Sequence, residues 1–252
     1  GEIFLDSCRQ VLEYIEGAER RVRGEDAEPR GALKVAAPIL FGRLHVLPII
    51  TRILTKHPSL TVHLTLSDRN IHLAEESVDV AVRVGDLADT SMKAIRLGSV
   101  SRVLVASPRY VERRGMPKAP NDLSAHDIIA FESLDATNEW RFGPSGKVVR
   151  VEPRLTVNSA DAAIAAAEAG LGISRTLSYQ VMDSVLAGRL VPLLVSFTAE
   201  KLPVSAIYPA RRIASTNLGA FIKNAREYFK DDPLVPIEEW EMPASSDLAT
   251  HR

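Results

Sequence analysis

The chain has 252 residues, of which 46% are hydrophobic and 25% are charged. This composition is typical of a globular protein with a well-formed core, and it excludes a disordered or fibrous chain. The 31 basic and 32 acidic residues nearly cancel, so the sequence provides no strong positive field to attract nucleic acid.

The first ten residues, GEIFLDSCRQ, carry acidic side chains where a signal peptide would carry basic ones. No apolar run in the sequence reaches the roughly 18 residues that a membrane-spanning helix needs. Cys8 is the only cysteine, which excludes an internal disulfide framework. The sequence therefore predicts a soluble, unexported protein in a reducing, cytoplasmic setting.

The N-terminal segment has a helical pattern. Its apolar residues recur at alternating spacings of four and three, at Phe4, Cys8, Val11, Ile15, Ala18 and Val22. This pattern fits either a short coiled coil of about three heptads or an amphipathic helix packed on its own domain. The charged residues 23–31, which include Pro29 and Gly31, are predicted to form a linker.

Strands and helices alternate over residues 32–85. The apolar patterns predict strands at 32–38, 60–66 and 78–85, and helices at 42–57 and about 70–76. The first of these helices carries Leu44, Leu47, Ile50 and Leu54 on one face. Strands separated by helices at this spacing indicate a parallel sheet covered by helices.

The second half of the chain repeats this theme less regularly. Strands are predicted at 101–108, 127–131, 147–158, 190–194 and 204–209, with a turn at Gly143–Gly146 and a proline-rich loop at 116–121. Helices are predicted at 109–114, 160–169, 179–187 and 215–229, the last burying Leu218, Phe221, Ile222, Ala225 and Phe229. The pattern indicates two α/β units of about a hundred residues each. Residues from 231 onwards lack periodicity and are expected to form a loosely attached tail in which Trp240 docks locally.

The helix at 160–169 is built largely of alanine. Ser159 is its predicted N-cap, Asp161 complements its positive end, and Gly170 closes it. The alanines either let another backbone approach closely, from the sheet or from a second subunit, or reflect helix propensity alone.

A catalytic or metal-binding motif is not found in the sequence. The histidines do not form an HExxH pattern, no serine lies in GxSxG, and AGLGIS at 169–174 lacks the pattern and the lysine of a phosphate loop. His57 and His63 are better explained as structural or surface residues than as metal ligands. No enzymatic activity, cofactor or metal is therefore expected.

Several segments resemble the regulatory, effector-binding half of LysR-type transcriptional regulators. They are GRLHVLP, HPSLTVHLTLSDR, DVAVRVG, VLVASPRYVERRGMPKAPNDLSAHD and AAEAGLGIS, and the resemblance covers residues 1–229. It implies a type 2 periplasmic-binding-protein-like α/β fold, with two α/β lobes joined by two crossover strands and preceded by an amphipathic linker helix. It assigns residues 1–30 to the linker helix and connector, 31–103 plus 205–230 to the first lobe, and 104–204 to the second lobe. Residues 231–252, the expected C-terminal tail, lie outside the resemblance.

The resemblance also implies partners. The linker helix would pair two protomers in a homodimer, or in a tetramer, and DNA would be bound only through a winged helix-turn-helix expected before Gly1. An effector would shift the populations of open and closed lobe arrangements, and the helices at 43–57 and 160–169 would transmit this shift through dimer contacts. The alternative class is a solute-binding protein of a transport system, which would share the fold but require an export signal.

In such a fold the effector, an organic acid or an aromatic compound, lies in the cleft between the lobes. The resemblance brings to this cleft Pro38, Ile39, Leu40, Ser67, Asp68, Arg83 and Gly85 from the first lobe, and Phe131, Asn158, Ser159, Ala160, Ser174 and Arg175 from the second. The amides that begin helix 160–169 suit a carboxylate, whereas the loop APILF lacks the hydroxyl residue of organic-acid binders and favours an apolar or aromatic effector. Each residue also has a structural alternative, as a helix cap, a turn residue or a member of an ion pair.

Overall fold

The computed structural model describes residues 28–68, 78–86, 92–134, 137–143, 146–197, 201–210, 215–231, 233–235, 237 and 240. The predicted helices at 2–22 and 70–76 lie outside the described residues. The chain divides into unit 1, residues 1–97 and 204–233, and unit 2, residues 98–203 and 234–252. The lobe boundaries expected from the resemblance, after residues 103 and 204, stay a prediction.

Unit 1 is built on a mixed five-stranded sheet with the order β2-β1-β3-β12-β4. Its strands are β1 (Gly31–Ala37), β2 (Leu60–Leu66), β3 (Val80–Val84), β4 (Met92–Val100) and β12 (Leu202–Pro209). β1 pairs in parallel with both β2 and β3, while β12 is antiparallel to β3. The predicted parallel α/β core is therefore confirmed, but β4 was not predicted, because its alternation of charged and apolar residues leaves most of it partly exposed.

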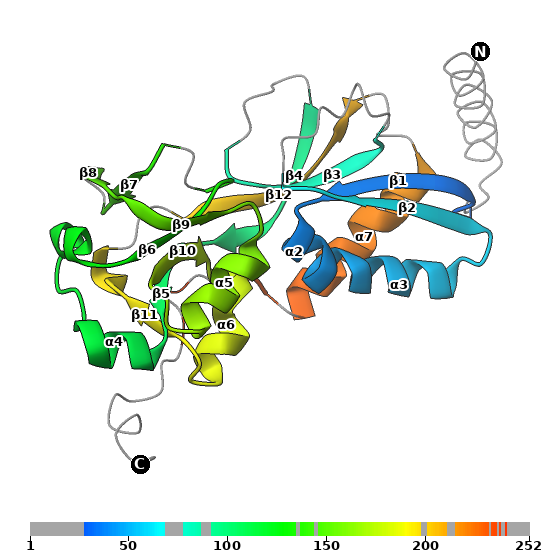
Figure 1. The fold of residues 1–252 in the computed structure, drawn as a ribbon. Helices are drawn as coiled ribbons and strands as arrows, with labels where there is room; N and C mark the ends of the chain where they lie inside the picture. The colour runs from blue at the N-terminus through cyan, green and yellow to red at the C-terminus, as the bar shows by residue number, and fades with distance from the viewer. Residues whose placement is uncertain are drawn as a thin grey trace. The chain divides into compact units, whose positions relative to one another are not determined.

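Helices cover one face of this sheet (Figure 1). They are α2 (Ile39–Phe41), a π-helical turn (Gly42–Val46), α3 (Leu47–Lys56) and α7 (Thr216–Asp231). α3 packs against α7, and the His45 ring lies 4.8 Å from the Phe41 ring and 5.7 Å from the Phe229 ring. The five residues predicted to be inward on the last helix are all buried.

The predicted apolar face of the helix at 42–57 is only partly correct. Ile49, Ile50 and Ile53 are buried in α3, whereas Leu47 is 48% and Leu54 is 37% exposed. The π-helical turn explains the difference, because it holds more residues per turn and shifts the phase of the helix that follows.

Unit 2 contains a second five-stranded sheet with the order β11-β5-β10-β6-β9. Its strands are β5 (Arg102–Ala106), β6 (Ile128–Phe131), β9 (Pro153–Val157), β10 (Ile173–Leu177) and β11 (Val191–Leu193), and its helices are α4 (Pro108–Arg114), α5 (Ala160–Glu168) and α6 (Ser178–Leu186), with short 3-10 helices at Pro120–Ala125 and Val195–Phe197. β6 pairs in parallel with β9 and β10, and β5 is antiparallel to β10.

The two faces of the second sheet are covered differently. α5 packs on the central strands. A hairpin of β7 (Glu139–Phe142) and β8 (Lys147–Arg150) brings Trp140 and Phe142 into a cluster with Ile128 and Ile173 of the sheet. Trp140 is fully buried there. Residues 139–142, for which no strand was predicted, thus form a strand that supplies the largest side chain of this core.

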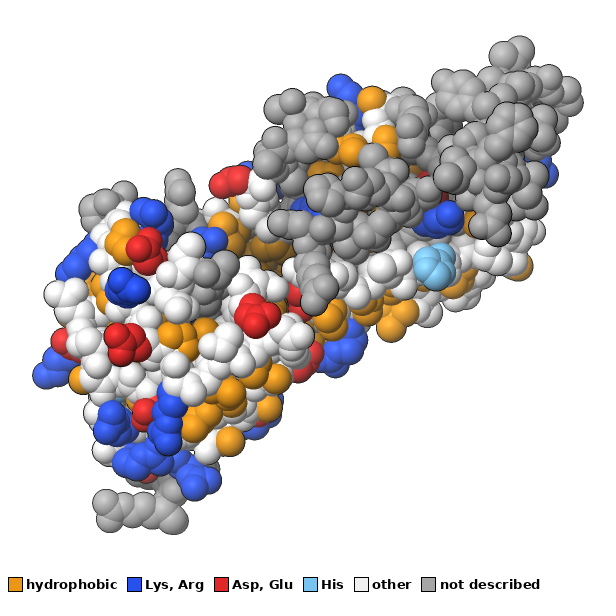
Figure 2. All heavy atoms as spheres, turned by 45° about the horizontal axis from the view of Figure 1, so that its top comes forward, with side chains coloured by type: hydrophobic (Ala, Val, Ile, Leu, Met, Phe, Trp, Pro, Cys, Tyr) orange, Lys and Arg blue, Asp and Glu red, His pale blue; other side chains and the backbone are white. Residues whose placement is uncertain are grey.

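The first residues of the C-terminal tail are ordered by local contacts. The Trp240 indole N–H donates to the Val235 carbonyl at 3.1 Å, which confirms the expected local docking. Ile237 is buried, however, so this part of the tail is attached more firmly than predicted. Acidic and basic side chains are interspersed on the face shown in Figure 2, in keeping with the net charge of −1.

Candidate functional site

In unit 1, three adjacent parallel strands end at one edge of the sheet. The strands are β2, β1 and β3, which are neighbours in that order. Pro38 directly follows β1, Ser67 follows β2 and Gly85 follows β3. Because parallel strands have their carboxyl ends on the same side, these three loop starts share one edge. The residues predicted at 38–40, 67–68 and 85 therefore gather at this edge, which we call the unit 1 edge.

A hydrogen bond joins the first two loops of the unit 1 edge. The backbone N–H of Ile39 donates to the Asp68 carboxylate at 3.0 Å, and the N–H of Ser67 donates to the Ala37 carbonyl at 3.0 Å. The Asp68 carboxylate thus occupies an amide at the start of α2 that an anionic ligand would otherwise use. Ile39 stays 39% exposed, while Leu40 is buried beneath it. The exposed surface of these loops is therefore apolar beside a carboxylate.

The third strand contributes Arg83 and Gly85. Arg83 lies within β3, opposite Ser205 of β12, and is partly buried. Gly85 has φ +104°, a conformation that strains any residue with a Cβ. The glycine lets the chain turn immediately after the strand.

In unit 2, the parallel strands β9 and β6 also end side by side. Phe131 is the last residue of β6, and Asn158 follows β9. The Glu132 N–H donates to the Val157 carbonyl at 2.9 Å, which holds the two strand ends together. We call the edge formed by Phe131 and residues 158–160 the unit 2 edge.

The helix that begins at the unit 2 edge is capped as predicted. The Ser159 hydroxyl accepts from the Ala162 N–H at 3.4 Å, and Asp161 lies in the first turn. Gly170 takes the left-handed conformation, with φ +82°, after the last turn. Asn158 is exposed, whereas Ala160 is buried.

Ser174 and Arg175 lie inside the sheet, on β10. Ser174 is fully buried, opposite Ile129 of β6 and Val105 of β5. Arg175 is 8% exposed, donates to the Leu134 carbonyl at 2.7 Å, and places its guanidinium 5.0 Å from the centre of the Trp140 ring. The structure therefore gives Arg175 a positioning role, because it holds the turn after β6.

Thr176 was not predicted from the sequence. It is fully buried on β10, and its hydroxyl and that of Ser174 have no hydrogen-bond partner within the described part of the chain. Since Ser174 is level with Ile129 in parallel strands, Thr176 is level with Phe131 at the end of β6. The signal available in the sequence was the alternation of hydroxyl residues in ISRTL, 173–177.

The resolved pKa shifts occur away from the two edges. Burial, with a smaller contribution from Arg114, lowers the pKa of His126, whose Nδ1 lies 3.2 Å from the Tyr110 hydroxyl. That hydroxyl accepts from the Asp127 N–H at 2.9 Å, so its own proton is available to neutral His126. At the end of α5, hydrogen bonds from Ser184 and Arg189 lower the pKa of Glu168. These groups stabilise unit 2 and do not form a reactive centre.

The described residues contain no cluster of three or more His, Cys, Asp or Glu side chains that could hold a metal ion. Nor does any helix in that part of the chain have the length and apolar character needed to cross a membrane.

Several known proteins are similar to this chain in sequence. Residues 26–230 match the family model described as the LysR substrate binding domain. An HTH-type transcriptional repressor of Pseudomonas aeruginosa (strain UCBPP-PA14) is 32% identical over 253 residues, covering 99% of this chain and 80% of the repressor. The HTH-type transcriptional regulator CrgA of Neisseria meningitidis serogroup C (strain 8013) is 27% identical over 227 residues, covering 88% and 75% of the two chains.

Solved structures give the same result. The CrgA regulatory domain from Neisseria meningitidis superposes with a TM-score of 0.71 at 25% identity, covering 79% of this chain and 98% of that domain. The similarity confirms the predicted type 2 periplasmic-binding-protein-like fold. Because these relatives are named as transcriptional regulators, a solute-binding protein of a transport system is not favoured, and the named relatives are not enzymes.

Proposed function

The chain belongs to the LysR substrate-binding domain family and is the effector-sensing part of a transcriptional regulator; from this premise we propose that the effector is a small apolar or aromatic molecule. It contacts the unit 1 edge through Pro38, Ile39, Leu40, Ser67, Asp68, Arg83 and Gly85. It contacts the unit 2 edge through Phe131, Asn158, Ser159 and Ala160, with Ser174 and Arg175 holding the strands behind it.

The bond between Ile39 and Asp68 carries this proposal. It holds the first two loops of unit 1 together and leaves the Ile39 side chain exposed. The Asp68 carboxylate repels an anion at that edge, and like charges brought together in a poorly solvated site are costly. An effector with an apolar face toward Ile39 therefore fits better than a small dicarboxylate.

The unit 2 edge supports one polar group on the effector. The first turn of α5 presents backbone amides and the positive end of the helix dipole, which together favour an acceptor or a single negative charge. The Ser159 hydroxyl accepts from the Ala162 N–H and therefore lies at the start of α5, where we propose that the polar group of the effector binds. The proposed effector thus directs its polar end to unit 2 and its apolar body to unit 1.

A thermal-shift screen tests the proposal. Aromatic acids, organic acids, amino acids and sugars are each added to the wild-type chain and to the double variant Ser67→Ala/Ser159→Ala. A ligand at a hundred times its dissociation constant stabilises the fold by about 2.7 kcal/mol if it binds only the native state. We expect an aromatic or apolar compound to give a saturable shift that the double variant loses.

The matched control is Ser107→Ala. Ser107 caps α4 by accepting from the Tyr110 N–H at 3.3 Å, so this variant also loses a helix cap of unit 2 but lies outside both edges. Its ligand-induced shift should equal that of the wild type. An equal shift in the double variant would instead refute binding at the two edges.

We further propose that the chain forms a homodimer through α3 and α5. The exposed side chains of Leu47 and Leu54 lie two turns apart on α3, a spacing that forms one apolar stripe. Exposed alanines on α5, Ala162 and Ala165, provide a second surface that another backbone can approach. The dimer contact transmits the shift between the open and closed lobe arrangements. An effector shifts the populations of these two arrangements by no more than the difference between its affinities for them.

Light scattering coupled to size exclusion tests the dimer. Leu47→Glu/Leu54→Glu should convert the dimer, or a tetramer assembled from it, to a smaller species. Met116→Glu is the control, since Met116 is also an exposed apolar residue, at 56%, but lies in a loop of unit 2. A monomeric wild-type chain at high concentration would overturn the proposal. DNA contact is assigned to a helix-turn-helix domain, as the relatives' names indicate, and not to residues 26–230.

A further inference from the structure

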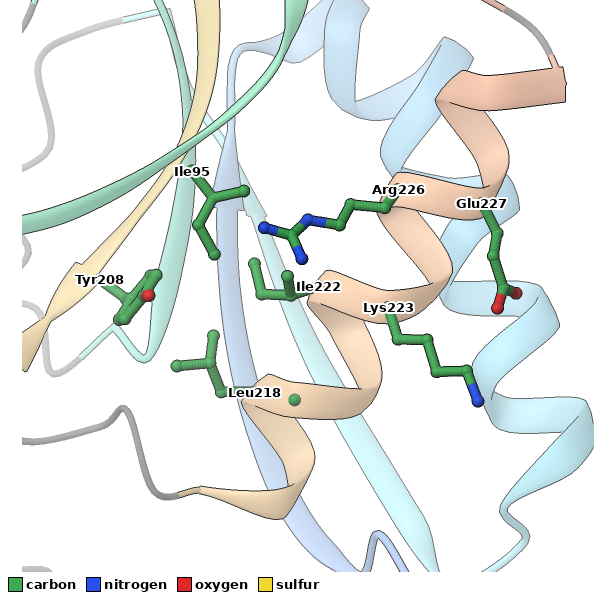
Figure 3. A pocket seen from close by; sticks show the side chains of 8 residues that line it. Ile95, Tyr208, Leu218, Ile222, Lys223, Arg226 and Glu227 are labelled. Carbon is green, nitrogen blue, oxygen red and sulfur yellow. The ribbon is translucent and has the colours of Figure 1, made fainter.

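A cavity of about 440 Å³ lies within unit 1, away from the unit 1 edge. Ile95 of β4 and Tyr208 of β12 form one wall, and Leu218, Ile222 and Arg226 of α7 form the other (Figure 3). We call it the α7 cavity. Its volume is within the roughly 300–1,000 Å³ of small-molecule sites, and none of its lining residues belongs to the residues predicted to bind the effector.

The floor of the α7 cavity is apolar and buried. Leu218 and Ile222 are one helical turn apart and are buried, as is Tyr208. Gly219, on the next position of the helix, leaves the cavity open, because a Cβ added there would meet no atom within 4 Å. A ring or a short alkyl chain can therefore lie against Leu218 and Ile222 without rearrangement of the helix.

A single positive group extends over this floor. Figure 3 shows the Arg226 side chain reaching across Ile222 toward Ile95. Lys223 and Glu227 also line the cavity, but their side chains point away from Ile222 in this view. Within the part of the chain that the structure describes, Arg226 has no ion-pair partner. A guanidinium beside an apolar surface can bind a carboxylate through paired, charge-assisted donors.

The Tyr208 hydroxyl supplies a second polar contact. Tyr208 is 6% exposed and lines the cavity opposite Arg226. The Tyr208 hydroxyl has no hydrogen-bond partner among the described residues. It can therefore donate to the same carboxylate or to a second oxygen of the ligand.

We propose that the α7 cavity binds a small amphipathic carboxylate, with its apolar body against Leu218 and Ile222 and its carboxylate on Arg226. This is a second ligand site, contained in unit 1 and separate from the proposed effector site. Arylacetic acids and short fatty acids both have an apolar body and a carboxylate, so both fit the α7 cavity. Comparing the binding of the two classes decides which apolar body fits.

Isothermal titration tests the site with phenylacetate and hexanoate, and with phenylacetamide and hexanamide as neutral controls. We expect one or both carboxylates to bind the wild-type chain and the amides to bind at least about tenfold more weakly, the loss expected for one charge-assisted hydrogen bond. Arg226→Gln should weaken carboxylate binding by the same factor and leave amide binding unchanged.

The substitutions at Gly219 separate filling of the cavity from a general effect on the helix. Gly219→Phe places a ring in the cavity and should abolish binding, whereas Gly219→Ala keeps the cavity open and should bind as the wild type does. Circular dichroism checks that both variants are folded. Arg226→Gln, a change on an exposed residue, provides the independent test if the phenylalanine variant does not fold.

The effector-site variant distinguishes the two sites. Ser67→Ala/Ser159→Ala should retain carboxylate binding in the α7 cavity even if it loses its effector. The cavity proposal is overturned if neither carboxylate binds the wild-type chain at millimolar concentration. It is also overturned if Gly219→Phe and Arg226→Gln bind with wild-type affinity.

Discussion

Replacing Gly172 by alanine is expected to destabilise unit 2 strongly. Gly172 directly precedes β10, and an added Cβ would overlap the carbonyl oxygen of Asp127 and lie 2.9 Å from its carbonyl carbon. Backbone atoms cannot rotate away as a side chain can. The same oxygen accepts a 2.9 Å hydrogen bond from the Ile173 N–H, at the point where β10 begins to pair with β6.

The cost follows from these distances. Ordinary Cβ contacts begin at 3.4 Å, and the carbonyl oxygen overlaps more than the carbonyl carbon, so the Asp127 backbone must move by about an ångström. Overpacking of this kind costs about 1–3 kcal/mol, and a buried acceptor that loses its donor adds about 1–3 kcal/mol. We therefore expect the free energy of unfolding to fall by about 3 kcal/mol, a large part of the roughly 5–15 kcal/mol of a typical domain.

Urea denaturation followed by tryptophan fluorescence measures this effect, because both tryptophans, Trp140 and Trp240, belong to unit 2. Gly188→Ala is the control. Gly188 has φ +70° but no atom within 4 Å of an added Cβ, so its substitution should cost only the backbone strain of about 1–2 kcal/mol. If Gly172→Ala is less destabilising than Gly188→Ala, the steric reasoning is refuted.

Three further predictions concern unit 2. Because the pKa of His126 is lowered in the folded chain, stability is present above its ordinary value of about 6.5 and is lost as the pH falls below it; His126→Gln should flatten the decline of the thermal midpoint in that window, and an unchanged decline would contradict this. Ser159→Ala should lower the free energy of unfolding by about 1 kcal/mol through loss of the helix cap, with Ser159→Asp close to wild type. Arg175→Met should cost about 2 kcal/mol by removing the bond to Leu134 and the contact with Trp140, and unaltered stability and tryptophan emission would argue against its positioning role.

Regular amphipathic elements could be predicted from the sequence. β2 has the predicted bounds, 60–66, and α7 buries the predicted face. The phase of α3 could not be predicted, because a π-helical turn precedes this helix. That turn starts at Gly42, where the absence of a Cβ leaves space that the Leu66 side chain fills. That contact joins positions far apart in the sequence, and local periodicity does not contain it.

The candidate site divides in the same way. The family resemblance could place Ser67 and Asn158 at an edge, because each directly follows a parallel strand. The surroundings of Arg175 could not, because they depend on Leu134, 41 residues away, and on a hairpin that brings Trp140 under the guanidinium. Burial of Ser174 also depends on strands on both sides of β10.

The strand order of unit 1 has a consequence for synthesis of the chain. β12 lies between β3 and β4, and α7 packs on α3, yet β12 and α7 are made after nearly all of residues 98–203. A nascent chain that ends near residue 203 therefore contains nearly all of unit 2, while β3 and β4 still expose unpaired backbone groups. Such edges are prone to wrong pairing and are protected in cells by chaperones. Unit 1 therefore cannot be completed until residues 98–203 of unit 2 have been made.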